Sequence, residues 1–164
     1  MQQTDVKSFH VMTGVPSAGP TYRTRLKGAV VSNTASGTPA NIYFANNVSL
    51  SGTFNIPTST TCTVTTTTAH GLTTGDRVWL DFTSGAGTTD NAYTVTVTTT
   101  VAFTVTTASL TTSGNVTVYA QPLMEIDITN SVPVNVLVPG EGILAANGIF
   151  VGTPANIAAT VFYG

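Results

Sequence analysis

Apolar and polar residues alternate one by one through much of this sequence. The pattern is clearest over residues 77–82, where Val, Leu and Phe alternate with Arg, Trp and Asp, and it recurs over residues 93–97 and 101–105. A period of two places alternate side chains on opposite faces of a strand. Thr, with 34 copies, supplies many of the polar positions, and its β-branched side chain suits a pleated surface. Almost nothing has helical periodicity, so the sequence predicts an all-β fold.

Composition divides the chain into parts. Residues 58–120 hold 24 of the 34 Thr, while the flanking segments carry the longer apolar runs and share the hexapeptide Gly-Thr-Pro-Ala-Asn-Ile at residues 37–42 and 152–157. We therefore predict a discontinuous β-sandwich or jelly-roll-like domain from residues 21–57 and 121–164. A second, Thr-rich β-barrel or sandwich of residues 58–120 is inserted in one of its loops. Residues 1–20 are expected to form an extended arm that orders on contact.

Gly, Asn, Asp, Ser and Pro punctuate the predicted strands. The sequence predicts turns at residues 84–87, 90–91, 113–115 and 139–140.

Charge and cysteine content exclude several classes of protein. Only 12 residues are charged, the net charge is −2, and there is no basic cluster of the size that phosphate neutralisation requires, so we expect no nucleic-acid partner. The single Cys62 rules out an internal disulfide framework or a multi-cysteine zinc site. The first residues lack a basic and then apolar signal sequence, and no apolar run reaches membrane-spanning length, so we expect a soluble, unprocessed protein made in a cytoplasm, with no membrane partner.

One motif in the Thr-rich segment resembles a known module. Ala69-His70-Gly71-Leu72 is followed by Gly75-Asp76-Arg77-Val78, and then by the strand patterns of residues 93–96 and 101–105. This arrangement is similar to the A-H-G-L-x-x-G-D-x-V module of bacteriophage structural proteins, particularly those of tails and fibres. It departs from that module at Asn91-Ala92, where the family often has Asn-Gly. The resemblance implies that His70, Gly71, Gly75 and Asp76 shape a turn and carry no catalysis.

The flanking segments resemble a second group of phage proteins. The likeness rests on residues 25–31, 138–144, 147–151 and the terminal Val161-Phe162-Tyr163-Gly164. These motifs are looser, and they are similar to those of small virion proteins such as head decoration (cement) proteins. Both resemblances imply a virion structural protein.

No set of residues forms a convincing catalytic, cofactor or metal site. His70 and Asp76 are better explained as a histidine that binds turn backbone and an Asx-turn than as an acid–base pair. His10 has no partner at metal-ligand spacing, and Cys62 is expected to be a buried, unreactive thiol. Glu125 and Asp127 share one strand face, which favours a solvated surface over a glycosidase pair. Adding the remaining acidic residues does not produce a calcium loop: Asp5, Asp81, Asp90 and Glu141.

Three of the five basic residues alternate along one segment. Arg23, Arg25 and Lys27 are expected to share a strand face, opposite Tyr22, Thr24 and Leu26. Such a stripe can protect a sheet edge from aggregation, or it can dock onto an acidic partner such as a capsid shell. Trp79, the single tryptophan, is expected to be buried in a core or an interface, with a rim contact or sugar platform as the alternative.

The distribution of charge favours assembly. Residues 28–75 and 91–124 contain no Asp, Glu, Lys or Arg, which gives an isolated monomer weak protection against association. We therefore expect a homo-oligomer bound within a larger assembly, and the resemblance implies a trimer.

The leading hypothesis is a non-enzymatic head decoration protein that binds the major capsid protein or other virion proteins on the capsid surface and assembles in the host cytoplasm. The alternative is a tail or fibre-associated protein with weak glycan binding through the Thr-rich segment, and a polysaccharide-degrading enzyme is a distant third.

Overall fold

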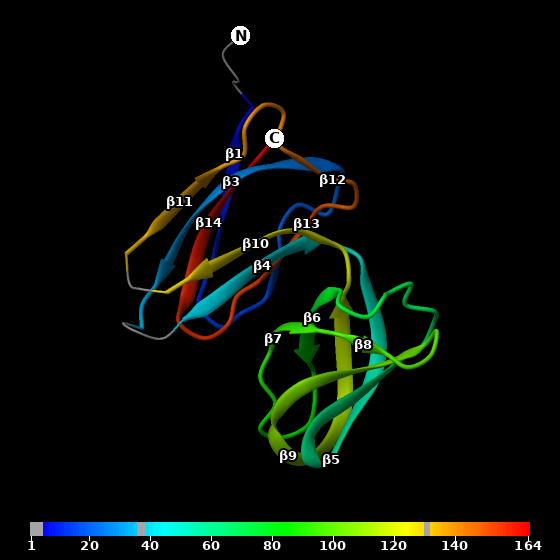
Figure 1. Ribbon diagram of the computed structural model, residues 1–164. Coiled ribbons are helices and arrows are strands. Elements are labelled where there is room, and N and C mark those ends of the chain that lie inside the picture. The colour runs from blue at the N-terminus through cyan, green and yellow to red at the C-terminus, as the bar shows by residue number, and fades with distance from the viewer. Residues whose placement is uncertain (1–4, 36–38, 130–131) are drawn as a thin grey trace. The chain divides into compact units, whose positions relative to one another are not determined.

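A computed structural model describes residues 5–35, 39–129 and 132–164 (Figure 1). The fold is all-β, as the alternation predicts: these residues form antiparallel strands in three sheets and contain no helix. It follows that no described helix is long and apolar enough to cross a membrane. The chain divides into two compact units, Met1–Asn47 with Leu123–Gly164 (unit 1) and Val48–Pro122 (unit 2).

The first sheet of unit 1 joins strands from both ends of the chain. Its order is β1 (Lys7–Val11), β14 (Ile157–Tyr163), β3 (Thr24–Asn33) and β11 (Val134–Leu137), and β12 (Ile143–Ala145) also pairs with β3. Every pairing is antiparallel. Figure 1 shows the blue and red strands of the two chain ends side by side in this sheet.

The second sheet of unit 1 completes a sandwich. Its order is β10 (Pro122–Ile128), β4 (Ala40–Asn46), β13 (Ile149–Gly152) and β2 (Ser17–Ala18). Alternate residues of both sheets point into one apolar core, as expected for packed sheets with hydrophobic inner faces. The fully buried members of this core include Leu26, Val31, Phe44, Ile149 and Val161.

The predicted N-terminal arm is different in the structure. Of the described part of residues 1–20, Lys7–Val11 pairs with β14 along its whole length, and Ser17–Ala18 pairs with β13. Val11 is fully buried in the core. The prediction of an arm rested on the Gly and Pro residues of this segment. The residues between them form β1 and β2, which add one strand to each sheet of unit 1.

Unit 2 is one curled sheet with its own core. The two long strands β5 (Ser49–Thr66) and β9 (Ala102–Tyr119) pair with each other, and the order continues through β6 (Arg77–Phe82) to β7 (Asn91–Thr94), while β8 (Thr96–Val97) pairs with β9. Figure 1 shows how strongly both long strands bend. The bend brings the two ends of β5 together, where the Thr67 amide donates to the Ser51 carbonyl over 2.9 Å. This contact links the ends of one strand and encloses the core around Phe103, Val64 and Val118.

The predicted start of the Thr-rich segment at residue 58 falls inside β5. Unit 2 begins ten residues earlier, at Val48. Thr58 has a φ of 49°, and the register between β5 and β9 shifts between Ile56 and Ser59. Thr58 therefore lies at a bulge in a continuous strand and not at the boundary between the two units.

The turn predicted at residues 113–115 is wrong. Ser113, Gly114 and Asn115 lie within β9 and pair with residues 53–55. A Cβ on Gly114 would lie 2.7 Å from the carbonyl oxygen of Ser84, so this glycine permits the 83–87 loop to approach the strand. Each copy of the repeated hexapeptide runs into a strand, since β4 begins at Ala40 and β14 at Ile157. Residues 37 and 38 of the first copy lie outside the described residues.

Candidate interaction surface

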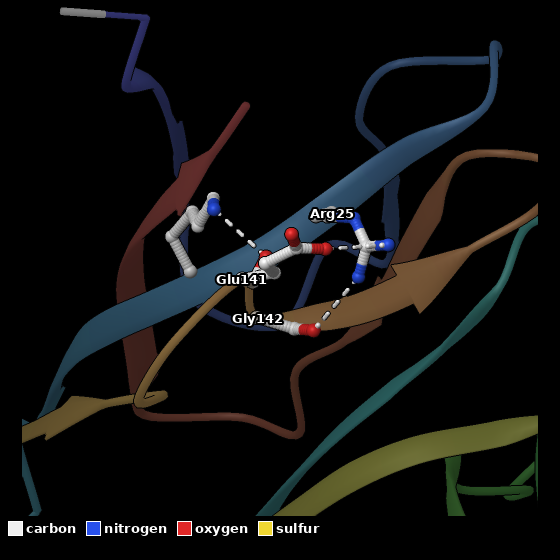
Figure 2. A network of polar contacts seen from close by, with 4 residues as sticks. Arg25, Glu141 and Gly142 are labelled. Carbon is white, nitrogen blue, oxygen red and sulfur yellow. Dashed lines mark hydrogen bonds and ion pairs between the residues drawn. The ribbon is translucent and has the colours of Figure 1, made fainter. Parts of the chain in front are cut away.

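The three basic residues singled out in the sequence have different surroundings. Arg25 lies on the outer face of β3, where its Nη2 forms an ion pair with Glu141 Oε2 at 3.1 Å and its Nη1 donates to the Gly142 carbonyl at 3.3 Å. Figure 2 shows the guanidinium pointing toward both groups. Lys27 Nζ donates to the Glu141 backbone carbonyl over 2.7 Å. Two of the three cations are therefore engaged by a single turn of the same chain.

Glycine shapes that turn. The turn of residues 139–142 lies in the connection from β11 to β12, and both Gly140 and Gly142 have positive φ. A Cβ on Gly142 would approach the Leu26 carbonyl oxygen to 2.4 Å, so only glycine lets the turn lie this close to β3. The close approach carries Glu141 to Arg25. The Glu141 side chain is still 83% exposed, so the ion pair is one of the weak surface kind.

Arg23 is the cation that the turn does not reach. It is exposed and makes no hydrogen bond or ion pair with any described residue. Arg23 and Arg25 line a shallow depression of about 250 Å³ together with Thr24, Leu144 and Gly164. Tyr22, beside them in the chain, is 54% exposed. Arg and Tyr are residue types enriched at the centre of protein interfaces.

A second, larger depression lies on the outer face of the same sheet. It has a volume of about 530 Å³ and is lined mainly by apolar side chains. We call it the unit 1 groove; it is formed by Val6, Lys27, Val30, Asn135, Leu137, Val138, Pro139 and Phe162. Leu137 is 74% exposed, whereas Val134 at the other end of β11 is half-buried and packs on the core.

Exposed apolar side chains are distributed unequally between the two units. Among the described residues, every large apolar side chain that is exposed belongs to unit 1. These are Val6, Met12, Val15, Tyr22, Val132, Leu137 and Leu144. Unit 2 presents Thr and Ser instead, and one of its depressions, of about 560 Å³, is lined by Ser51, Gly52, Thr53, Thr65, Thr66, Thr67, Thr83, Asn115, Val116 and Thr117. Two of these seven side chains, Val6 and Leu137, lie together in the unit 1 groove.

The His70 turn lies in unit 2, and its groups face the backbone. His70 is buried and its ring packs edge-on against Phe103 at a centroid distance of 5.5 Å. Its Nδ1 accepts from the Leu72 amide at 3.0 Å, so the proton is on Nε2, which donates to the Thr99 carbonyl at 3.0 Å. Both ring nitrogens are thus occupied by main-chain groups.

The other residues of this turn also have local contacts. Gly71 and Gly75 have φ values of 65° and 102°, which are left-handed conformations that favour glycine. Asp76 Oδ2 accepts from the amide of Thr73 at 2.8 Å. This bond runs three residues backward, whereas the predicted Asx-turn would run forward. The carboxylate therefore closes the turn by a different contact from the one expected.

The remaining candidate residues are dispersed. His10 lies on β1 with Nδ1 3.3 Å from Thr160 Oγ1, at an exposed position. Glu125 and Asp127 are both exposed on β10, and Asp127 Oδ1 accepts from Asn41 Nδ2 at 2.7 Å. Trp79 is fully buried on β6. No group of three or more His, Cys, Asp or Glu in the described residues could hold a metal ion.

Burial raises the pKa values of several side chains in unit 2. Burial raises the pKa of the Cys62 thiol to about 11. Burial also raises the pKa of the Asp81 carboxyl, with a smaller contribution from the charge of Asp90. The pKa of Asp90 is itself raised by burial, although its bond from the Phe82 amide, at 2.8 Å, acts in the opposite direction.

Sequence reasoning missed the unit 1 groove and the role of Glu141. The groove combines residues from four separate segments, and the period-two pattern of each strand shows only that some side chains face outward. The Pro-Gly-Glu-Gly sequence at 139–142 did indicate a tight turn, but not that it folds onto β3.

No protein-family model and no curated protein matches the chain.

Proposed function

We propose that this protein is a non-enzymatic structural component of a bacteriophage virion, and specifically a head decoration protein that assembles as a trimer on the capsid. The proposal starts from the resemblance of the His70–Val78 motif and of the flanking segments to phage structural proteins. The observation that carries it further is the concentration of exposed apolar side chains on unit 1. Contiguous exposed apolar patches mark interaction sites, and the unit 1 groove brings six apolar side chains together in one place.

The mechanism is stabilisation by binding. Unit 1 contacts the shell through its groove, around Leu137 and Phe162, and buries apolar area across the junctions between capsid subunits. A ligand that binds only the assembled shell stabilises it by mass action, by a free energy that rises with the logarithm of its free concentration relative to Kd, and no covalent chemistry is required. Unit 2, with its Thr-rich surface, remains in solvent.

A binding assay tests this role of the groove. Purified protein is mixed with phage capsids that lack it, and the fraction that sediments with the capsids is measured against protein concentration. Leu137→Asp places a charge in the apolar contact and should weaken binding by tenfold or more, by analogy with interface hot spots. Thr106→Asp adds the same charge at an exposed position of unit 2 and should leave binding unchanged. Equal binding of both variants would refute a contact through the groove.

One observation favours the alternative of a tail protein with glycan affinity. The unit 2 depression of about 560 Å³ is lined by hydroxyls and contains no charged group. Several hydroxyls there make no hydrogen bond to the described residues, including those of Thr53, Thr65 and Thr117. A neutral carbohydrate offers the matching mixture of donors and acceptors. Binding of the protein to host-surface glycan, together with its loss from particles that lack tails, would support this alternative over head decoration.

A further inference from the structure

One outermost strand of unit 1 has an uncharged and nearly symmetric sequence. β11 ends the first sheet, where it pairs with β3 and with no other described strand (Figure 1). Residues 133–139 read Pro-Val-Asn-Val-Leu-Val-Pro, with a proline three residues to either side of Val136 and Val at both positions 134 and 138. Only Asn135 and Leu137 break the symmetry. This edge therefore presents almost the same residues when it is read in either direction.

The backbone of β11 directs two residues away from the sheet. The Val138 amide donates to the Lys27 carbonyl over 2.9 Å, so the main chain of Val138 faces β3. Main-chain groups of an antiparallel strand alternate in direction, so Val136 also faces β3, while Asn135 and Leu137 face away from it. No described group bonds to the amide or the carbonyl of either residue. The free edge of β11 therefore presents the donors and acceptors that a further strand would need.

The other edges of unit 1 are protected against such pairing, whereas this one is not. β1 carries Lys7, β10 carries two carboxylates, and β2 and β12 have only two and three residues. Charges and short length are the usual devices that keep an edge from pairing with its own copy. β11 carries no charge, and its Leu137, at 74%, is the most exposed large apolar side chain of the described residues. The flanking prolines lack an amide donor, so they confine any pairing to the short stretch between them.

We propose that β11 pairs antiparallel with β11 of a second copy about a two-fold axis through Val136, so that the first sheets of two molecules join into one. In this register Asn135 of each chain lies opposite Leu137 of the other. Both members of such a pair exchange amide-to-carbonyl bonds, and the two pairs together make about four of them. A second copy is the partner because a two-fold contact brings the same surface of both molecules together, and this edge is symmetric and brings no like charges into contact.

The pairing uses the edge of the sheet and leaves its outer face free. Asn135 and Leu137 line the unit 1 groove with their side chains, so the pairing places the grooves of two molecules side by side. A two-fold contact does not close a trimer, and in the proposed assembly it links one trimer to the next. The inference is argued from the edge alone and goes beyond the proposed function.

Disulfide trapping tests the pairing and its register in purified protein without capsids. Opposite residues of a bonded antiparallel pair have Cα atoms about 5.5 Å apart, a separation that a disulfide spans. A mixture of Asn135→Cys protein with Leu137→Cys protein should therefore form a covalent dimer with oxidised glutathione. Either variant alone should form about tenfold less, because identical positions are then diagonal neighbours, about 7–8 Å apart. The native Cys62 is buried and does not compete.

A matched pair of cysteines on another edge measures random collision. Ser8 and His10 are exposed and two residues apart on β1, as Asn135 and Leu137 are on β11. A mixture of Ser8→Cys with His10→Cys protein should form no more dimer than either of these variants alone. The inference is overturned if the β11 mixture gives no more covalent dimer than this control, or if Asn135→Cys or Leu137→Cys alone gives as much as their mixture.

A proline variant tests the main-chain bonds separately. Asn135→Pro removes a donor that faces away from β3, so the sheet keeps its own bonds while the dimer loses about two of four. The dimer dissociation constant, measured by light scattering over a concentration series, should rise about tenfold. An unchanged constant would contradict the pairing.

Ser8→Pro is the control for this variant. The Gly164 main chain bonds to Arg25 of β3, so alternation along β14 turns Phe162 toward β3 and its partner Ser8 away from β14. The dissociation constant should therefore not change in Ser8→Pro, and far-ultraviolet circular dichroism checks the fold of both variants. If Asn135→Pro fails to fold, the cysteine mixture still decides the question. Binding to capsids is measured by sedimentation, so the shell contact and the edge pairing can fail independently.

Discussion

Replacing His70 with Ala tests whether the motif that resembles the phage module is structural. The substitution removes an acceptor from the Leu72 amide and a donor from the Thr99 carbonyl, both at 3.0 Å. Each such hydrogen bond contributes about 0.5–1.5 kcal/mol. The edge-on contact with Phe103 adds about 0.5–1.5 kcal/mol. We therefore expect His70→Ala to lower the free energy of unfolding of unit 2 by about 1.5–4.5 kcal/mol.

Trp79 provides the assay. It is the single tryptophan and is fully buried in unit 2, so its fluorescence during urea denaturation reports the unfolding of the unit that contains His70. Thr106→Ala is the control, because Thr106 is an exposed residue of the same unit. The control should change the unfolding free energy by less than about 0.5 kcal/mol. A loss below about 0.5 kcal/mol for His70→Ala as well would refute the structural role assigned to this histidine.

Three further outcomes follow from the local environments. Cys62 should react with a thiol reagent at pH 8 at least a hundredfold more slowly in the folded protein than in urea, because burial raises its pKa to about 11 and blocks access; equal rates would contradict this. Asp81→Asn should stabilise unit 2 at pH 7. The pKa of Asp81 is raised in the folded state, so its carboxylate costs stability once the pH rises through that pKa, and the gain from the variant should disappear on acidification; a gain that does not depend on pH would argue against this cause. Glu141→Gln should change the free energy of unfolding, followed by circular dichroism in urea, by at most about 1 kcal/mol, since its ion pair with Arg25 is exposed; a larger loss would contradict the weak contribution of this pair.

The sequence contained enough to predict the class of fold and several strands. The alternation over residues 77–82 corresponds to β6, and the Val101–Val105 pattern lies at the start of β9. Burial of Trp79 was also predictable, since a single large aromatic on a strand is rarely left in water. These features depend on local periodicity, which pairing between distant strands does not change.

Features that depend on contacts between distant segments were not predictable. Gly114 reads as a turn residue, but the loop that requires it comes from residues 83–87. Thr58 reads as a domain boundary, but it lies at a bulge in the middle of β5. In the same way, the charges of Arg23, Arg25 and Lys27 were visible in the sequence. The sequence did not show that the 139–142 turn lies on β3, where it contacts Arg25 and Lys27 but not Arg23.

The most direct test of the proposed function is the molar ratio of this chain to the major capsid protein in purified virions, determined by quantitative mass spectrometry. Head decoration predicts a ratio of the same order as the shell subunit, because a protein that stabilises the shell must occupy most of its repeated sites. A handful of copies per particle would contradict that account and would favour the tail.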